Sequence, residues 1–168
     1  PPKEVFDRVR LEVANFSCRM DNLRAALIRA QLPYLDSNIE RWNQLYDRLF
    51  VQLAGIDGIS IPQRSQAEFY VGSSIQFRAD ALTEQAIPEF LAGCASRGVE
   101  LKWFGADAPL AFTSRYDSWH YIKDMPDLPA TRAALSKTVD MRIPLTFGLD
   151  DCDVIIAIIA DELEKHTS

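Results

Sequence analysis

The stretch Asn15–Leu27, which reads NFSCRMDNLRAAL, opens the part of the chain whose pattern decides the fold. Within it, Met20, Leu23 and Leu27 recur at steps of three and four residues, which places them on one face of a helix. Two adjacent alanines in the same stretch are strong helix formers. This spacing predicts a short amphipathic helix from Arg19 to Ala30.

A second, longer helix follows an interruption. Pro33 removes a backbone donor and crowds the preceding turn, so the first helix ends or kinks there. The run Ser37–Glu40 resembles a capping box, in which the Ser and Glu side chains satisfy backbone N–H groups at a helix start. Beyond it, apolar residues at helical spacing form one stripe. The members of this stripe are Ile39, Trp42, Tyr46, Leu49 and Leu53. Gly55 and Gly58 end the helix.

These two helices cannot bury their apolar stripe alone, because a helix gains its stability mainly from tertiary packing. The sequence therefore predicts that residues 1–62 form a helical arm. We expect this arm to contact another domain and to take part in a dimer contact. The remaining residues, 63–168, would form a separate small domain.

The small domain begins with strand and helix patterns in turn. Apolar residues alternate from Phe69 to Phe77, which predicts a half-buried strand of about nine residues. A helix follows, with Pro88 in its first turn and Gly98 as its C-cap. Its apolar face consists of Ile87, Phe90, Leu91 and Cys94. A second alternating run, Val99–Trp103, predicts another strand.

The end of the chain combines a long loop with short elements. Residues 105–130 mix Gly and Pro with aromatic residues, which is typical of a loop. A short helix near 131–136, an extended piece over 141–147 and a closing helix follow. Asp150 or Asp151 caps the closing helix. Its buried face consists of Cys152, Ile155, Ile156, Ile159 and Leu163. This order predicts an α+β fold, in which helices cover a small, mostly antiparallel sheet.

Composition limits the possible functions. The 168 residues, 48% hydrophobic and 25% charged, are typical of a soluble globular domain with an appendage. A net charge of -6 with dispersed basic residues argues against nucleic acid or a membrane surface as partner. We expect a cytoplasmic protein, since the sequence shows neither a secretory signal nor an apolar run near the roughly 20 residues of a membrane span. Cys18, Cys94 and Cys152 are predicted to be free, mostly buried thiols.

Few residues carry a local signal for chemistry. The sequence contains no Walker-type phosphate loop, no paired Gly-x-Gly turn, no H-E-x-x-H motif and no G-x-S-x-G motif. His120 is either an ordinary packed histidine or part of the lining of a site. Asp150, Asp151 and Asp153 are better explained as carboxylates at a helix start than as metal ligands. We therefore predict no metal site.

The opening stretch resembles a signature of the DegT/StrS-type sugar aminotransferases, which depend on pyridoxal phosphate. Their segment N-x-R-M-x-x-L-x-A-A-x-x-x-x-Q-L is similar to the run from Asn15 to Leu32. Further similar segments follow in the family's order and spacing. These are Leu35–Asp36, Ile39–Asn43, Gly58–Pro62, Arg97–Glu100, Leu128–Thr131 and Met141–Thr146. The resemblance therefore covers almost the whole chain.

The resemblance implies the C-terminal small domain of a fold-type I transferase, whose full family is α/β. Such an enzyme moves an amino group to a keto-sugar or related carbonyl substrate with pyridoxal phosphate as cofactor. In the family, the imine-forming lysine belongs to a large N-terminal domain, and no segment here matches its motif. We expect that this domain is missing, that no catalytic residue lies in this chain and that the chain alone is inactive. The family's shared active site implies a homodimer.

The resemblance also implies the site residues. The family's N-x-R-M asparagine reaches the cofactor phosphate of the neighbouring subunit. Aligned on Arg19, Ser17 takes that position and Asn15 is the nearest asparagine; a serine hydroxyl also donates to phosphate. Arg19 either pairs with the phosphate or belongs to a structural ion pair. We expect Asn15, Ser17 and Arg19 to bind pyridoxal phosphate, and His120 and Tyr121 to contact the small-molecule substrate.

Two other hypotheses explain the same residues. The first is a noncatalytic interaction module that docks on a partner through the helical arm. The second is a self-contained small enzyme that uses His120 with Asp117 or Asp124. The run Lys102–Gly105 stands where many members of the family carry an H-Y motif directed at the sugar. A nucleotide-sugar substrate is therefore not implied for this chain.

Overall fold

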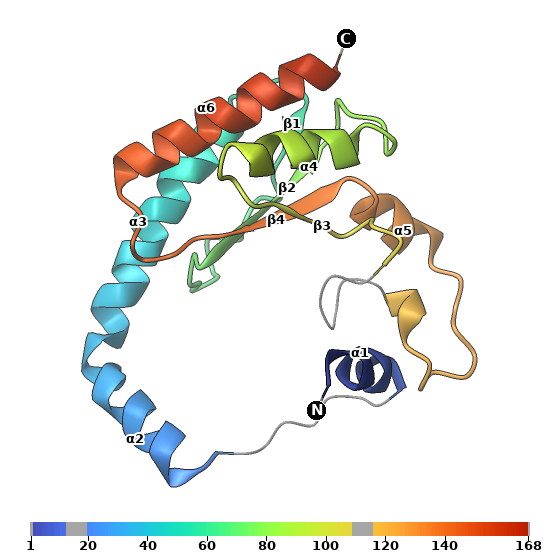
Figure 1. Cartoon of the computed structure of the whole chain (residues 1–168). Helices are drawn as coiled ribbons and strands as arrows, with labels where there is room; N and C mark the ends of the chain where they lie inside the picture. The colour runs from blue at the N-terminus through green and yellow to red at the C-terminus, as the bar shows by residue number, and fades with distance from the viewer. Residues whose placement is uncertain (1, 13–19, 109–115, 168) are drawn as a thin grey trace.

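The computed structural model describes residues 2–12, 20–108 and 116–167 (Figure 1). Helices and short strands alternate along the chain. In sequence order they are α1 (Lys3–Glu12), α2 (Asn22–Gln31), the 3-10 turn η1 (Leu32–Tyr34), α3 (Leu35–Leu53), β1 (Ile59–Ser60), β2 (Ser74–Ala79), α4 (Ile87–Ser96), β3 (Lys102–Trp103), η2 (Tyr116–Ser118), α5 (Pro129–Leu135), β4 (Thr138–Arg142) and α6 (Leu149–His166).

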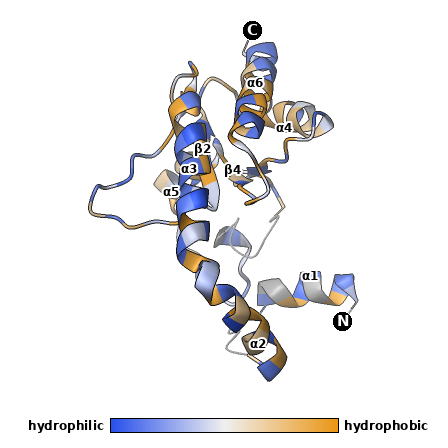
Figure 2. Cartoon of the chain, turned by 90° about the vertical axis from the view of Figure 1, so that its left-hand side faces the viewer, coloured by the Kyte–Doolittle hydropathy of each residue, from blue (hydrophilic) through white to orange (hydrophobic). Residues whose placement is uncertain are grey.

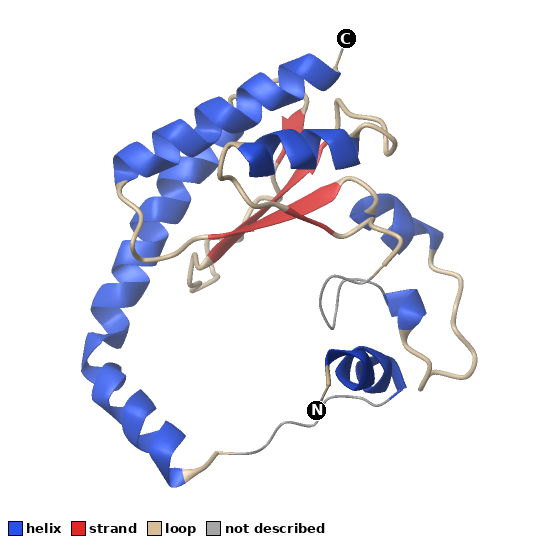
Figure 3. Ribbon diagram, in the orientation of Figure 1, coloured by secondary structure: helices blue, strands red, loops and turns tan. Residues whose placement is uncertain are grey.

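A four-stranded sheet with the order β1-β2-β4-β3 forms the centre, and all its pairs are antiparallel. In the central pair, Ile75 lies opposite Met141 and Phe77 opposite Val139. α4 and α6 lie over one face of this sheet, and α3 packs beside them (Figure 3). The predicted combination of helices with a small antiparallel sheet is thus confirmed.

The core lies between the sheet and these three helices. Each element contributes side chains with no exposed surface: Leu45, Leu49 and Leu53 from α3, Ile75 and Phe77 from β2, Phe90 and Cys94 from α4, Val139 from β4, and Cys152 and Ile159 from α6. Each large apolar side chain buried in this way stabilises the fold by about 1.5–3 kcal/mol. Most residues of the apolar stripes predicted for these helices lie in this core, whereas Ile39, Trp42 and Leu91 are only partly buried.

The capping box predicted at Ser37–Glu40 is wrong. α3 already begins at Leu35, directly after the 3-10 turn that contains Pro33. Proline fits at the start of that turn because its missing N–H is not needed there. Ser37 therefore lies inside the helix, and its Oγ donates to the carbonyl oxygen of Tyr34 at 3.0 Å.

The strand predicted over Phe69–Phe77 is wrong in its first half, since β2 begins at Ser74. The preceding residues run along α3 instead of pairing with a strand. The Gly72 N–H donates to Oδ1 of Asn43 at 2.8 Å. A Cβ added to Gly72 would lie 2.5 Å from the Cβ of Tyr46, so only glycine permits this approach. Here a hydrogen bond to a helix side chain takes the place of pairing with a neighbouring strand. The alternating sequence pattern could not indicate this contact.

The helices of the small domain are confirmed with small changes at their ends. Gly98 follows α4 with a φ of 88°, a left-handed conformation that suits glycine. The Asp151 carboxylate accepts the Gly148 N–H at 2.7 Å at the start of α6. Cys94 and Cys152 are free and buried, as predicted, whereas Cys18 lies outside the described residues. The extended piece predicted over 141–147 is displaced, since β4 spans Thr138–Arg142.

α2 and the first turns of α3 extend away from the sheet as an arm (Figure 1). α2 has no buried residue. Large apolar side chains are exposed along this arm: Met20, Leu23, Leu27, Ile28, Leu32, Tyr34 and Leu35. Figure 2 shows hydrophobic residues on α2, at the end of the arm farthest from the sheet. No helix in the described part of the chain is long and apolar enough to span a bilayer.

Candidate functional site

His120 lies in the turn after η2 and contacts the end of α1. Its Nδ1 lies 2.8 Å from Oε1 of Glu12. Both side chains are about half exposed, at 56% and 53%. The sequence pattern had suggested Asp117 or Asp124 as the carboxylate partner. Glu12 was missed because 108 positions separate it from His120 in the chain.

Tyr121 follows His120 and presents an aromatic surface. Its ring stacks on that of Trp119, with centroids 5.9 Å apart and an interplanar angle of 15°. The turn is closed by the Ile122 N–H, which donates to the carbonyl oxygen of Trp119 at 3.2 Å. Tyr121 remains 41% exposed. The structure thus brings an imidazole, a carboxylate and a stacked aromatic pair together on one surface.

The residues predicted to bind the cofactor, Asn15, Ser17 and Arg19, lie outside the described residues. In the sequence, their segment directly follows Glu12, the residue that contacts His120. α2 begins just after the same segment. Its N-cap is Asp21, whose Oδ1 accepts the Arg24 N–H at 2.8 Å.

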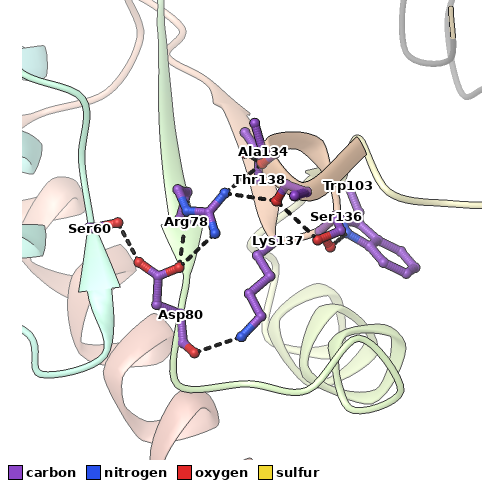
Figure 4. A network of polar contacts seen from close by, with 9 residues as sticks. Ser60, Arg78, Asp80, Trp103, Ala134, Ser136, Lys137 and Thr138 are labelled. Atoms are coloured by element: carbon purple, nitrogen blue, oxygen red, sulfur yellow. Dashed lines mark hydrogen bonds and ion pairs between the residues drawn. The ribbon is translucent and has the colours of Figure 1, made fainter. Parts of the chain in front are cut away.

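A polar network at one end of the sheet was not anticipated from the sequence (Figure 4). Arg78 of β2 donates from Nη1 to the carbonyl oxygen of Ala134 in α5 at 2.7 Å and from Nε to Oδ1 of Asp80 at 3.0 Å. Ser60 also donates to the Asp80 carboxylate. Burial favours the neutral form of Asp80, but the hydrogen bonds from Ser60 and Arg78 outweigh it and lower the pKa. Lys137 Nζ donates to the backbone carbonyl of Asp80 at 2.9 Å.

This network fixes the place where the long loop leaves the sheet. Next to it, Trp103 Nε1 donates to the carbonyl oxygen of Ser136 at 2.7 Å. Gly105 passes so close that an added Cβ would lie 2.6 Å from Trp103 Nε1 and 2.8 Å from the Ser136 oxygen. The loop that begins at Gly105 leads to the turn with His120.

The described residues do not by themselves fit pyridoxal phosphate. A lysine that forms an imine with this cofactor is desolvated or activated by a neighbouring cation. The five lysines of the chain are Lys3, Lys102, Lys123, Lys137 and Lys165, and none of them is buried. Lys165 Nζ donates to Oε1 of Glu162 at 2.6 Å, and Lys137 bonds the backbone of Asp80. We assign no cofactor chemistry to these residues.

The acidic residues at the start of α6 serve the fold. Asp151 caps the helix, and Asp153 accepts hydrogen bonds from Arg48 and Gln52 of α3. Among the described residues, no group of three or more His, Cys, Asp or Glu side chains is arranged to hold a metal ion. These carboxylates therefore provide helix capping and a contact between helices.

Comparison with known proteins gives a family and a fold. A model of the DegT/DnrJ/EryC1/StrS aminotransferase family matches residues 2–160. A search of curated proteins gave no match. Among solved structures, the chain is similar to 3-amino-5-hydroxybenzoic acid (AHBA) synthase, with 23% identity and a TM-score of 0.71. This similarity covers 92% of this chain and 41% of that chain.

Two further structures show the same similarity. The aminotransferase TlmJ from Streptoalloteichus hindustanus is 20% identical with a TM-score of 0.67, over 92% of this chain and 40% of that one. The sugar aminotransferase CalS13 from Micromonospora echinospora is 16% identical with a TM-score of 0.59, over 77% and 32%. At these identities the similarity establishes the fold. The chain spans about two fifths of the length of the first two structures.

Proposed function

The chain belongs to the DegT/DnrJ/EryC1/StrS aminotransferase family, and from this membership we propose that it is the C-terminal portion of a pyridoxal-phosphate-dependent aminotransferase. The complete enzyme would transfer an amino group to a keto-sugar or a related carbonyl compound. The family match over residues 2–160 is the observation that carries this proposal. The similarity to the sugar aminotransferase CalS13 supports the substrate class.

We propose separate roles for the two parts of the chain. Residues 1–62 contribute the arm, which contacts the rest of the enzyme and a second subunit. The exposed apolar residues of α2 support this role, because such a surface gains stability when another surface covers it. Residues 63–168 form the small domain, into whose core the C-terminal half of α3 packs.

The site residues remain proposals. Asn15, Ser17 and Arg19 would bind the cofactor phosphate, and His120 and Tyr121 would contact the substrate. The contact between His120 and Glu12 supports the combination, since it joins the turn that carries the substrate residues to the residue just before the cofactor segment. The catalytic lysine would come from the large domain, so the chain alone would not transaminate.

Adding pyridoxal phosphate to the purified chain tests the assignment of the lysine. The expected result is no imine absorbance, because none of the five lysines is buried. A stable imine band that survives gel filtration would contradict the proposal. The intact mass of the protein in its native cells provides a second test, with a mass well above 19.0 kDa expected. A native protein no longer than this chain would favour the noncatalytic interaction module instead.

The role of the arm is tested separately by sedimentation of the chain. We expect a concentration-dependent dimer that the double substitution Leu23→Ser and Leu27→Ser weakens at least tenfold. Val51→Ser is the matched control, since Val51 is 71% exposed but lies in the C-terminal half of α3, which packs into the small domain. A chain that stays monomeric, or a control that weakens the dimer equally, would remove the dimer contact from the proposal.

A further inference from the structure

A cavity of about 440 Å³ lies at the edge of the sheet where β3 and β4 separate. One wall is the chain from Gly98 to Lys102, and the other is the strand segment Asp140–Arg142. Phe147 and Ile155 close it from the side of α6. Its volume falls in the range of about 300–1,000 Å³ that is usual for small-molecule sites. In Figure 1 this edge lies beneath α4 and α6.

The cavity exists because the ladder between the two strands stops early. Lys102 lies opposite Asp140 in the last pair toward the cavity. Continuing the same register would place Glu100 opposite Arg142. Within the described part of the chain, no backbone hydrogen bond joins Glu100 and Arg142. The two chains therefore diverge at this point.

The backbone of β4 points into this gap. On the β2 side, the Ile143 N–H donates to the carbonyl oxygen of Ser73 at 3.0 Å. On the β3 side, the Phe104 N–H donates to the carbonyl oxygen of Thr138 at 3.0 Å. Backbone groups alternate between the two sides along a strand, so those of Arg142 face the β3 side, like those of Thr138. The cavity is therefore bordered by one backbone donor and one backbone acceptor.

The lining also carries both signs of charge. Asp140 is buried, with 8% exposure, and accepts a hydrogen bond from Gln76 Nε2 at 2.6 Å. A buried carboxylate that accepts from a neutral amide retains the capacity to bind a cation. Glu100, Lys102 and Arg142 also line the cavity, and no ion pair in the described parts of the chain involves any of these three. Lys102 Nζ lies over the ring of Phe104, 4.7 Å from its centroid.

The inner surface of the cavity is apolar. Val99 and Met141 are each 4% exposed, and Ile155 is 9% exposed. Together with Phe147 they form a surface that suits an unbranched or singly branched aliphatic chain. A ligand for this cavity therefore needs a cationic group, an anionic group and an apolar tail.

We propose that the cavity binds a free α-amino acid with an aliphatic or thioether side chain. Its carboxylate accepts from the N–H and guanidinium of Arg142, and its ammonium group donates to Asp140 and Glu100. Successive side chains of a strand point to opposite faces, so Asp140 and Arg142 lie on the face away from Met141. The ligand therefore lies in the gap between β3 and β4, and its side chain passes through this gap to the apolar surface. A longer peptide does not fit as well, because it would have to continue along the edge of β4 that β3 already covers at Lys102.

The test is a titration of the whole ¹⁵N-labelled chain with L-methionine, followed by amide chemical shifts. We expect saturable shifts of Leu101, Arg142 and Ile155. 4-(Methylthio)butanoate, which lacks the amino group, and 3-(methylthio)propylamine, which lacks the carboxylate, should each bind at least tenfold more weakly. N-acetyl-L-methionine amide, which resembles a peptide segment, should also bind at least tenfold more weakly.

Substituted variants distinguish binding in the cavity from binding elsewhere on the surface. Arg142→Gln, an exposed substitution, and Asp140→Asn, which keeps the side-chain shape, should each weaken L-methionine binding at least tenfold. Arg132→Gln is the matched control, because Arg132 pairs with Asp127 outside the cavity. The proposal is overturned by the absence of saturable shifts or by affinity unchanged in Arg142→Gln. It is also overturned if the amide analogue binds as tightly as L-methionine, which would indicate a peptide partner.

Discussion

Arg48 of α3 and Asp153 of α6 form a two-point ion pair, with Nε–Oδ1 and Nη2–Oδ2 distances of 2.7 Å each. Gln52 Nε2 also donates to Asp153, at 2.6 Å. The hydrogen bonds from Arg48 and Gln52 lower the pKa of Asp153 from 3.8 to about 2. The pair joins the helix that carries the arm to the last helix of the small domain.

Asp153→Asn should therefore destabilise the chain in a pH-dependent way. Because the pKa is lower in the folded state, the ionised carboxylate stabilises the fold above about pH 4, and this contribution is lost as pH falls toward about 2. Urea unfolding across this range is the measurement. Asp150→Asn, at the start of the same helix, is the control. A difference from the unsubstituted chain that stays constant with pH would contradict this assignment.

Arg78→Met should loosen α5. Arg78 donates hydrogen bonds to two carbonyl oxygens of α5, those of Ala133 and Ala134. A hydrogen bond that involves a charged group contributes about 1.5–3 kcal/mol. Hydrogen exchange of the amides around Ala134 should become faster, while exchange in α6 stays unchanged. Arg132→Met, on α5 itself, is the control. Unchanged exchange in Arg78→Met would show that the network does not hold α5.

Gly72→Ala should destabilise the fold by about 1–3 kcal/mol, the usual cost of overpacking. The new Cβ would lie 2.5 Å from Tyr46 Cβ and 3.1 Å from the Trp42 carbonyl oxygen. Gly55→Ala is the matched control, since its Cβ would lie no closer than 3.4 Å to its nearest neighbour. Chemical denaturation of both variants is the measurement. Equal stability of the two variants would mean that the segment around Gly72 shifts to accommodate the new Cβ without a loss of folding free energy.

Cys94 should resist alkylation in the folded chain. Burial raises its pKa from 9.0 to about 12, with the Glu162 carboxylate adding to the effect. The thiolate fraction at mildly alkaline pH is then on the order of 1,000-fold lower than in the unfolded chain. Mass spectrometry after iodoacetamide treatment, with and without urea, measures the difference. Equal labelling of Cys94 in both states would contradict its burial.

The helices could be predicted from the sequence because their signal is local. Leu49 and Leu53 follow the same stripe along the chain and meet the same core in the structure. The start of β2 could not be predicted from the sequence. It depends on the Asn43 side chain, which accepts a hydrogen bond from Gly72, 29 positions away in the chain. The periodicity of a sequence shows which side chains are apolar. Where strand pairing begins depends on polar contacts between residues far apart in the chain.

The candidate site was harder to predict for the same reason. His120 meets Glu12 across 108 positions, and Arg78 meets Ala134 across 56. No motif records such pairs. Asn15, Ser17 and Arg19 were instead assigned as cofactor-binding residues from the resemblance to a family. A family signature reflects a shared fold, which a single sequence does not reveal. Those three assignments stay predictions.

α3 is fixed in the core at its C-terminal end and extends from it at its N-terminal end. Its 19 residues make a rod about 28 Å long. One end is clamped against α6, and the other carries α2. The buried residues of α3 begin at Leu45, so a tilt of about 10° about Leu45 would move Leu35, ten residues or about 15 Å away, by about 3 Å. A small change in packing beside Asp153 would thus be enlarged at α2, which continues the arm beyond Leu35.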